Sequence, residues 1–501
     1  FTSVVKEMGE MLRRTALSTN VKERLDFSCA FLDRNGELVV NAPHIPVHLG
    51  AISLCVQRII KDMKLSPGDV IVTNHPAYGG SHLPDVTVIT PVFTGSEVLL
   101  GFVASRAHHA EIGGTMPGSM PPSAGRLIEE GVIIPPTYIV EKGRDRFDLV
   151  RKILTGGPYP SRAVEDNLAD LNAAIAANQL GVINLRKLAH KHGEDTLFHY
   201  MLEIKKHAGQ KIRKALKKIP DGKYEAIEYL DDGSPLCVRL DIKGDKAHIS
   251  FEGSSGVHPG NLNTTPAVVR SVVIYVLRLL LDEPLPLNEG FWSAVTLDIP
   301  GGILDPGFDR EIEDCPAIVG GNVETSQRLV DTMLKALEMA ACSQGTMNNV
   351  IFGTDDFTYY ETVCGGCGAG PGYDGASAVH SHMTNTRITD PEIVEHRYPV
   401  RIEKFAIREN SGGQGRHRGG DGTVREISFL RHMSLSILGQ HRNEGPYGLK
   451  GGRPGKPGKQ YVIKKGGEII NLGPIDRCEV GPGDRFIIKT PGGGGYGMPS
   501  P

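Results

Sequence analysis

The spacing of apolar and polar positions predicts short helices and strands in alternation along the first part of the chain. Apolar residues at helical spacing predict a helix over residues 4–17. Two β-branched runs around a polar tip at residues 34–36 predict a hairpin within residues 22–41. Residues 44–60 pass from a proline-containing turn into an amphipathic helix, and residues 70–73 are predicted to form a strand.

The middle of the chain changes first to long helical patterns and then to strands. Two helices are predicted between residues 162 and 218, with a break at Gly193. Strands separated by Asp- and Gly-containing turns follow from residue 221, and residues 325–341 form a predicted helix capped by Thr325 or Asn322. From residue 345 the chain is rich in glycine and carries short strands. These patterns predict an α+β fold with mixed and antiparallel sheets, a helical middle segment and a Gly-rich β-rich C-terminal region.

A chain of 501 residues is too long for one hydrophobic core. The changes in pattern divide it into an N-terminal α+β region, a helical segment, an α/β region and the Gly-rich region. The predicted boundaries are 1–160, 161–220, 221–345 and 346–501.

The most informative segment lies between Gly79 and Gly114. Residues 86–93 and 98–105 are rich in β-branched residues and predict two strands joined by a two-residue turn at Gly95 and Ser96. If Thr94 pairs with Glu97 across that turn, the rest of the register of the hairpin follows.

This register brings chemically active side chains to one end of the hairpin. Asp85 lies opposite Arg106, His82 lies opposite His109, and His108 is one step away. Imidazole and carboxylate groups on a rigid scaffold suit a divalent transition metal. Taken singly, each of these side chains could be an ordinary residue at a strand end. Their convergence favours a metal site or a polar catalytic cluster, with His109 slightly preferred over His108 by the register.

Composition excludes several classes of function. The formal net charge of −3 provides no electrostatic footprint for nucleic acid or an anionic membrane. The most apolar segment, residues 271–281, is about half the ~20 residues that span a bilayer, and it predicts a buried helix or strand. The eight cysteines are scattered without a disulfide framework, which favours a reducing, cytoplasmic setting. The lone Cys364-Gly-Gly-Cys367 motif is interpreted as two reduced thiols.

Other polar residues near the predicted strands are weaker candidates. Asp26 precedes a strand and follows Arg24 closely, so it is either a turn carboxylate or a site residue. His44 and His48 lie four residues apart, and they could support a site residue from outside, contact a substrate or begin a helix. His75, in an Asn-His-Pro sequence, could add or position a ligand.

The glycine clusters do not predict a nucleotide site. Residues 451–459 lack the Ser or Thr that follows the Lys of a phosphate loop, and prolines stand where free N–H groups are needed. Residues 413–420 lack a strand-to-helix context. If the chemistry uses ATP, we expect another chain to bind it.

Several segments together resemble the hydantoinase B/oxoprolinase family, over nearly the whole chain. The resemblance is carried by ERLDFSCA, NAPHIPVHLGA, GDVIVTNHPAYGGSHLPDVTVITPVF, VASRAHHAEIGG and PGSMPP in the first part, and by GNVETSQR, QGTMNN, GGCGAG, MTNTRITDPE and TPGGGGYG in the second. The long N-terminal motifs make it specific. The NHP and GGSHLPD motifs look most like the C-terminal half of ATP-dependent oxoprolinases.

The resemblance implies an enzyme with two components. A hydantoinase A-type partner subunit would bind ATP and phosphorylate a carbonyl or lactam oxygen, and this chain would complete the reaction in a hetero-oligomer. By analogy with the related carboxylases, His82, Asp85 and His108 would hold a divalent metal such as Zn, Mn or Fe. His109 or Asp26 would act as general base or orienting group.

Two positions depart from the family pattern. Glu111 stands where the family commonly has Asp, and Ala107 where it commonly has Gly. The longer Glu111 side chain argues against a direct metal-binding role for that carboxylate.

The leading hypothesis is an ATP-dependent hydrolase of cyclic amides, acting on a small lactam or hydantoin such as oxoproline. A second hypothesis keeps the metal but forms a carbon–carbon bond with CO₂, as in the acetone and acetophenone carboxylases. A third makes the chain a structural subunit whose metal only clamps loops.

Overall fold

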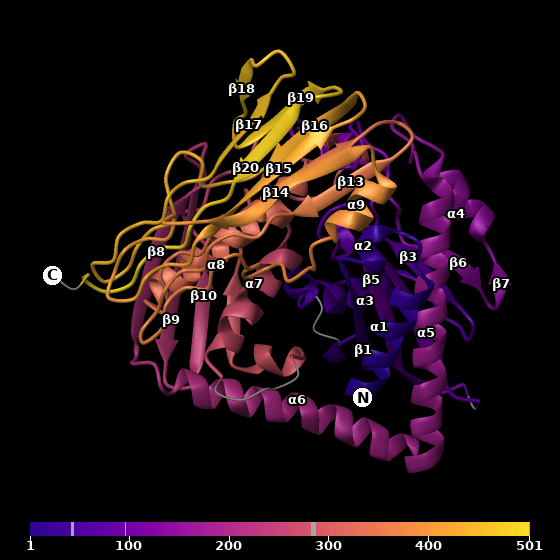
Figure 1. Cartoon of the computed structure of the whole chain (residues 1–501). Helices are drawn as coiled ribbons and strands as arrows, with labels where there is room; N and C mark the ends of the chain where they lie inside the picture. Colours follow the sequence, from indigo (N-terminus) through magenta and orange to yellow (C-terminus); the bar gives the residue numbers. More distant parts are fainter. Residues whose placement is uncertain (42–44, 96, 282–286, 500–501) are drawn as a thin grey trace.

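Helices and several β-sheets pack together in this chain, which confirms the predicted α+β fold class (Figure 1). The computed structural model describes residues 1–41, 45–95, 97–281 and 287–499. Within those ranges four sheets are formed; the first two follow one another along the sequence, and the strands of the last two alternate in it.

The first sheet has seven strands, and every neighbouring pair in it is antiparallel. Its spatial order is β2-β1-β5-β4-β3-β6-β7. The strands are β1 (Phe27–Leu32), β2 (Leu38–Asn41), β3 (Val70–Thr73), β4 (Asp85–Phe93), β5 (Leu99–His108), β6 (Thr137–Glu141) and β7 (Arg144–Asp145).

Helices cover both faces of this sheet, so its central strands are buried on both sides. Helices α1 (Thr2–Thr15) and α5 (Val164–His192) pack on one face, where Phe31, Val88 and Val103 belong to one hydrophobic cluster. Helix α3 (Ala51–Asp62) packs on the other face, against a second cluster that includes Ile89 and Phe102. Alternate residues of a strand point to opposite faces, so near-continuous apolar runs are expected in such strands.

The helical middle segment links this sheet to the next. Helix α5 runs along the first sheet, and α6 (Glu194–Leu216) leaves it at a sharp angle after Gly193, whose φ is +85° (Figure 1). Both helices were predicted, and the break at Gly193 is confirmed.

The second sheet has the order β11-β10-β9-β8 and is packed against helices α7 and α8. Its elements are β8 (Gly222–Tyr229), β9 (Pro235–Lys243), β10 (Lys246–Ser250), α7 (Pro266–Leu279), β11 (Val295–Asp298) and α8 (Ser326–Ala336). The apolar segment at residues 271–281 is therefore mostly helix. The predicted cap of α8 is wrong, because a π-helical turn at Gly321–Thr325 runs directly into the helix and Thr325 donates its hydroxyl to the carbonyl of Leu262.

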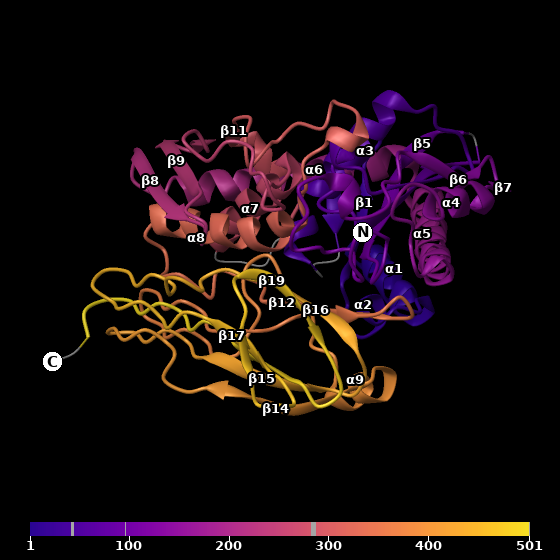
Figure 2. The ribbon, with the colours of Figure 1, turned by 90° about the horizontal axis from the view of Figure 1, so that it is seen from above.

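The Gly-rich region forms two further antiparallel sheets that enclose a third hydrophobic cluster, and they lie as a layer beside the other two parts (Figure 2). One has the order β13-β12-β16-β19 and the other β14-β15-β20-β17-β18. Their strands are β12 (Asn349–Gly353), β13 (Thr358–Thr362), β14 (Val400–Arg408), β15 (Gly422–Phe429), β16 (Met433–Leu438), β17 (Lys459–Ile463), β18 (Ile469–Asn471), β19 (Ile475–Val480) and β20 (Arg485–Lys489).

Three short helices complete the described part of the chain: α2 (Thr19–Lys22), α4 (Phe147–Leu154) and α9 (Pro391–Arg397). Among the described residues, none of the helices is both long and apolar enough to cross a lipid bilayer. The division into four regions at residues 160, 220 and 345 stays a prediction.

Candidate metal centre

The β4–β5 hairpin is formed as predicted, but with a different register. Asp85 pairs with His108, so the predicted pairing of Asp85 with Arg106 is wrong. The backbone N–H of Thr94 donates to the carbonyl of Val98, which lengthens the connection, and the register shifts again between Val92 and Phe93. The predicted turn residue Ser96 lies outside the described residues.

His82 lies in the loop before β4 rather than opposite His109, and that loop is anchored at both ends. Arg106 is fully buried and donates from Nη2 to the carbonyl of Gly79, at 2.9 Å. At the other end, the N–H of Asp85 donates to the carbonyl of His82, at 3.1 Å. The loop therefore presents His82 to Asp85 from a fixed position.

His82, Asp85 and His108 meet in one buried cluster. One candidate ligand atom from each lies within 4.8 Å of the others, and no second group of this kind is found in the described part of the chain. Asp85 Oδ2 lies 3.3 Å from His82 Nε2, and Asp85 Oδ1 lies 3.6 Å from His108 Nδ1. His82 Nδ1 and His108 Nε2 are buried without a hydrogen-bond partner. Two imidazoles with unpaired nitrogens beside a carboxylate fit a divalent transition metal.

The electrostatics of the cluster favour the protonation states that bind a metal. Burial alone would raise the pKa of Asp85, but the neighbouring His82 and His48 and the hydrogen bonds from His108 and His48 hold it well below its usual value. Burial lowers the pKa of His108, which keeps its imidazole neutral near pH 7. An ionised carboxylate and a neutral imidazole are the ligand forms of these groups.

His48 is a further member of this cluster, in the supporting position that the sequence left open for it. Its Nε2 lies 3.2 Å from Asp85 Oδ2, and its Nδ1 lies 3.0 Å from Ser28 Oγ. Its ring is therefore held between β1 and the carboxylate. The spacing from His44 was the sequence signal for His48, whereas His44 itself lies outside the described residues.

The cavity at the cluster is small and encloses space for about one water molecule. Its volume is about 20 Å³, close to the minimum that a single water requires. Asp26 lines this cavity, and its backbone carbonyl accepts a hydrogen bond from the N–H of His108. The ring of Tyr360 stacks on that of His108 at 4.9 Å between centroids. Groups from both the first and the C-terminal parts of the chain thus line the cavity.

His109, the other predicted catalytic residue, faces away from the cluster. Its Nδ1 lies 3.1 Å from the amide nitrogen of Asn167 on α5, and its backbone N–H donates to the carbonyl of Pro84. His109 is not among the residues that line the small cavity. Of the two predicted catalytic side chains, only Asp26 faces the space next to the three candidate ligands.

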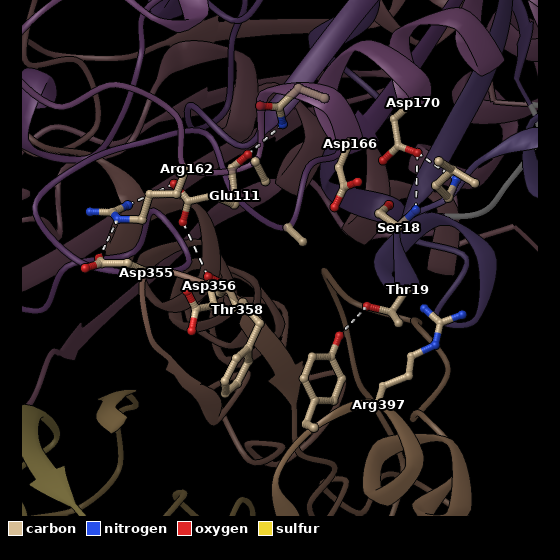
Figure 3. A pocket seen from close by; sticks show the side chains of 16 residues that line it. Ser18, Thr19, Glu111, Arg162, Asp166, Asp170, Asp355, Asp356, Thr358 and Arg397 are labelled. Carbon is tan, nitrogen blue, oxygen red and sulfur yellow. Dashed lines mark hydrogen bonds and ion pairs between the residues drawn. The ribbon is translucent and has the colours of Figure 1, made fainter. Parts of the chain in front are cut away.

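Glu111 is also held away from the cluster, at a separate cavity of about 300 Å³ (Figure 3). Its carboxylate lies 2.9 Å from Arg162 Nη1 and accepts the N–H groups of Gly113 and Gly118. Glu111 is therefore paired with Arg162 and not with the metal cluster. This agrees with the expectation that its longer side chain does not bind the metal directly.

His75 does not join the cluster either. Its Nδ1 accepts the N–H of Ala77 at the start of a single 3₁₀ turn. Cys364 and Cys367 are free thiols, as expected.

Comparison with known proteins agrees with the sequence motifs. A family model described as hydantoinase B/oxoprolinase matches residues 1–499. The chain belongs to the hydantoinase B/oxoprolinase family.

Relatives in this family carry names of cyclic amide hydrolases. The chain is 46% identical to 5-oxoprolinase 1 of Arabidopsis thaliana, an alignment that covers 99% of this chain and 41% of that protein. It is 30% identical to the caprolactamase subunit beta of Pseudomonas jessenii, over 99% of this chain and 88% of that subunit. The chain thus spans about two fifths of the length of the 5-oxoprolinase but most of the caprolactamase subunit.

Two solved structures share the fold. The ATP-dependent caprolactamase from Pseudomonas jessenii superposes with a TM-score of 0.89 at 27% identity, over 99% of this chain and 89% of that one. Acetone carboxylase in its nucleotide-free form also gives a TM-score of 0.89, over 99% of this chain and 74% of that one. At 17% sequence identity, this comparison supports a shared fold and nothing further.

Proposed function

We propose that this chain is the B-type component of an ATP-dependent cyclic amidase of the hydantoinase or 5-oxoprolinase type. It would hydrolyse a lactam or hydantoin ring after an A-type component has phosphorylated the ring carbonyl. The observation that carries the proposal is the buried cluster of His82, Asp85 and His108, in a family whose relatives include a 5-oxoprolinase and a caprolactamase.

Ring opening needs activation because the amide nitrogen donates electrons into the carbonyl group. Phosphorylation of the carbonyl oxygen removes this resonance. Water then adds to the carbon, and the ring C–N bond breaks as the nitrogen takes up a proton, which leaves an acyl phosphate. A second water hydrolyses this acyl phosphate to a carboxylate and inorganic phosphate. A divalent ion such as Zn, Mn or Fe, held by His82, Asp85 and His108, would supply Lewis acidity at this point.

The residues of the chain itself then have distinct tasks. Asp26 faces the cavity and would accept the proton of the attacking water. His48 and Ser81 hold Asp85 Oδ2 in place, at 3.2 Å and 2.5 Å. His109 would support the fold of the hairpin end through Asn167 rather than transfer protons.

The ATP-binding component is proposed to be a separate A-type subunit or the remaining part of a longer chain. The 5-oxoprolinase relative is more than twice as long as the aligned region, while the caprolactamase relative is a beta subunit of nearly the same length. A hetero-oligomer with a hydantoinase A-type ATPase subunit is the arrangement that we favour.

The test is ATP-dependent ring opening by the assembled enzyme, combined with metal analysis. His82→Ala and Asp85→Ala should lower the metal content and abolish turnover, and Asp26→Asn should keep the metal while lowering kcat by about 10²-fold or more. His248→Ala, which changes an exposed histidine on β10, is the matched control and should behave as the wild type.

Other outcomes would contradict the proposal in recognisable ways. Turnover that requires bicarbonate would support a carboxylase. Full activity of the metal-free His82→Ala variant would support a structural subunit, and a lower melting temperature on chelation would then be the only effect of the metal.

A further inference from the structure

The cavity at the metal cluster is too small for any ring substrate. At about 20 Å³ it holds one water or one ion, so a lactam must reach the cluster from a neighbouring space. A cavity of about 820 Å³ lies next to it, within the range of small-molecule sites.

The two cavities share a wall that is one residue thick. Thr384 lines both of them. On either side of it the chain alternates: Met383 and Thr386 line the small cavity, whereas His382 and Asn385 line the large one.

The segment before α3 forms a second part of the same wall. Ile45 and Val47 line the small cavity, and Pro46 between them lines the large one. Two segments far apart in sequence therefore present alternate side chains to the two spaces.

The lining of the large cavity combines an apolar surface with a polar edge on the side of Thr384. The apolar side chains come from α7, α8 and the loops that follow, and they include Leu279, Leu334, Met339, Ala340 and Pro371. At the polar edge, His380 Nδ1 and Ser381 Oγ are buried without a hydrogen-bond partner. An apolar chamber with a few unpaired polar groups at one edge is the usual form of a small-molecule site.

Hydrogen bonds with two neighbouring side chains fix the imidazole ring of His382 at this edge. Buried Asp331 lies 3.0 Å from His382 Nε2 through its Oδ1, and His382 Nδ1 lies 3.4 Å from the hydroxyl of Tyr275. His382 and Tyr275 both line the chamber, so their orientation is set before a ligand enters.

We propose that this chamber is the binding site for the ring of the cyclic amide, and that Thr384 is the opening through which the amide edge reaches the metal cluster. The ring methylenes would pack on Leu279, Leu334 and Met339, and the amide would face Ser381 and His382. This inference rests on the proposed function, because it assigns the substrate of the same site.

The test uses variants that reduce the volume of the chamber and leave the residues of the metal cluster unchanged. Ala340→Trp adds bulk to the chamber from the loop after helix α8, and Leu279→Trp adds it from a residue that is 46% exposed. Ala163→Trp, at the separate cavity of Figure 3, is the matched control. Binding of ε-caprolactam and of 5-oxoproline to the metal-loaded protein is measured by saturation-transfer NMR, and ring opening is measured in the assembled enzyme.

We expect both chamber variants to weaken lactam binding and raise KM by about tenfold or more, with metal content and melting temperature like those of the wild type. The Ala163→Trp variant should bind and turn over normally. Unchanged binding and KM in folded Leu279→Trp would overturn the chamber assignment. Absence of lactam turnover in the wild type would instead refute the proposed function, and so the two failures are distinguishable.

Discussion

At the scale of single residues, Asp85 is the centre of the site. It is buried and in contact with Ser81, His48, His82 and His108. A buried carboxylate is costly unless it is paired and hydrogen-bonded. A divalent cation held by Asp85, His82 and His108 would balance the charge of this carboxylate.

His48→Gln tests how strongly the contact between His48 and Asp85 supports metal binding. The variant removes the imidazole that holds Asp85 Oδ2 at 3.2 Å but leaves His82, Asp85 and His108 in place. Loss of such supporting contacts commonly weakens metal affinity by about 10–100-fold, and we expect a loss in that range. Competition with a chelator gives the affinity. An unchanged affinity would show that Asp85 is positioned without His48.

The sequence alone indicated the three candidate ligands but not the contact of His48 with Asp85. These two residues are 37 positions apart, and the segment of His48 meets the hairpin only through the packing of α3 and β1 around the sheet. Neither hydrophobic spacing nor a local motif reports such a contact.

At the scale of elements, the strands of the hairpin were predictable but their register was not. The β-branched runs mark β4 and β5 closely, whereas the number of residues in the turn depends on hydrogen bonds such as that from Thr94 to Val98. The observed register differs from the predicted one by two residues. A shift by two leaves every side chain on the same face of the sheet, so Asp85 and His108 stay on one face, and the observed register places them opposite each other.

Gly80→Ala tests whether the loop before β4 sets the position of His82. A Cβ at Gly80 would lie 2.4 Å from the carbonyl oxygen of Asn74, a backbone atom that cannot move aside freely. The loop would have to shift, and we expect metal content and turnover to fall by at least about tenfold.

Gly95→Ala, at the far end of the same hairpin, is the control for this variant. No atom lies within 4 Å of a Cβ at Gly95, so metal content should match that of the wild type. Normal metal binding by a folded Gly80→Ala protein would show that the loop adapts and does not determine the site.

At the scale of the whole molecule, the site is assembled from parts that no local pattern connects. The β4–β5 hairpin and the loop before it provide the three candidate ligands, β13 provides Tyr360, and the segment around Thr384 separates the cluster from the large chamber. The predicted element types agree with the structure in most segments. Their mutual packing, and with it the chamber, depends on contacts between distant residues that the sequence pattern does not encode.

In the Gly-rich region, too, the sequence pattern predicted only part of the structure, but for another reason. Its glycines predicted turns and loops, but several of them serve close backbone packing. A Cβ at Gly493, in the four-glycine run, would lie 1.9 Å from the carbonyl oxygen of Cys367. Only glycine permits this approach, and it joins the C-terminal segment to the CxxC loop.

A buried carboxylate also connects distant segments and makes stability depend on pH. Glu130 is fully buried, and its Oε1 accepts the N–H groups of Ile318 and Val319, each at 2.9 Å. Burial raises the pKa of Glu130 from 4.5 to about 8, against the smaller opposing effect of these two hydrogen bonds. Between these values the folded protein keeps a proton that the unfolded chain releases. The free energy of unfolding therefore falls as the pH rises through this range, and levels off above the folded-state pKa.

Glu130→Gln should remove most of this dependence, because the amide oxygen still accepts the two N–H groups but does not ionise. For the wild type we expect a loss on the order of 3 kcal/mol between pH 5 and 7.5 from this residue, seen as a lower melting temperature. Thermal unfolding at several pH values measures it. The neighbouring Glu129 has a lowered pKa and is already ionised in this range. Burial rather than the charge of Glu129 is the main cause of the raised pKa of Glu130, so Glu129→Gln should keep most of the slope. An equal slope in Glu130→Gln and the wild type would mean that Glu130 is ionised in the folded protein and that this junction between distant segments is held by a charge rather than by a neutral acid.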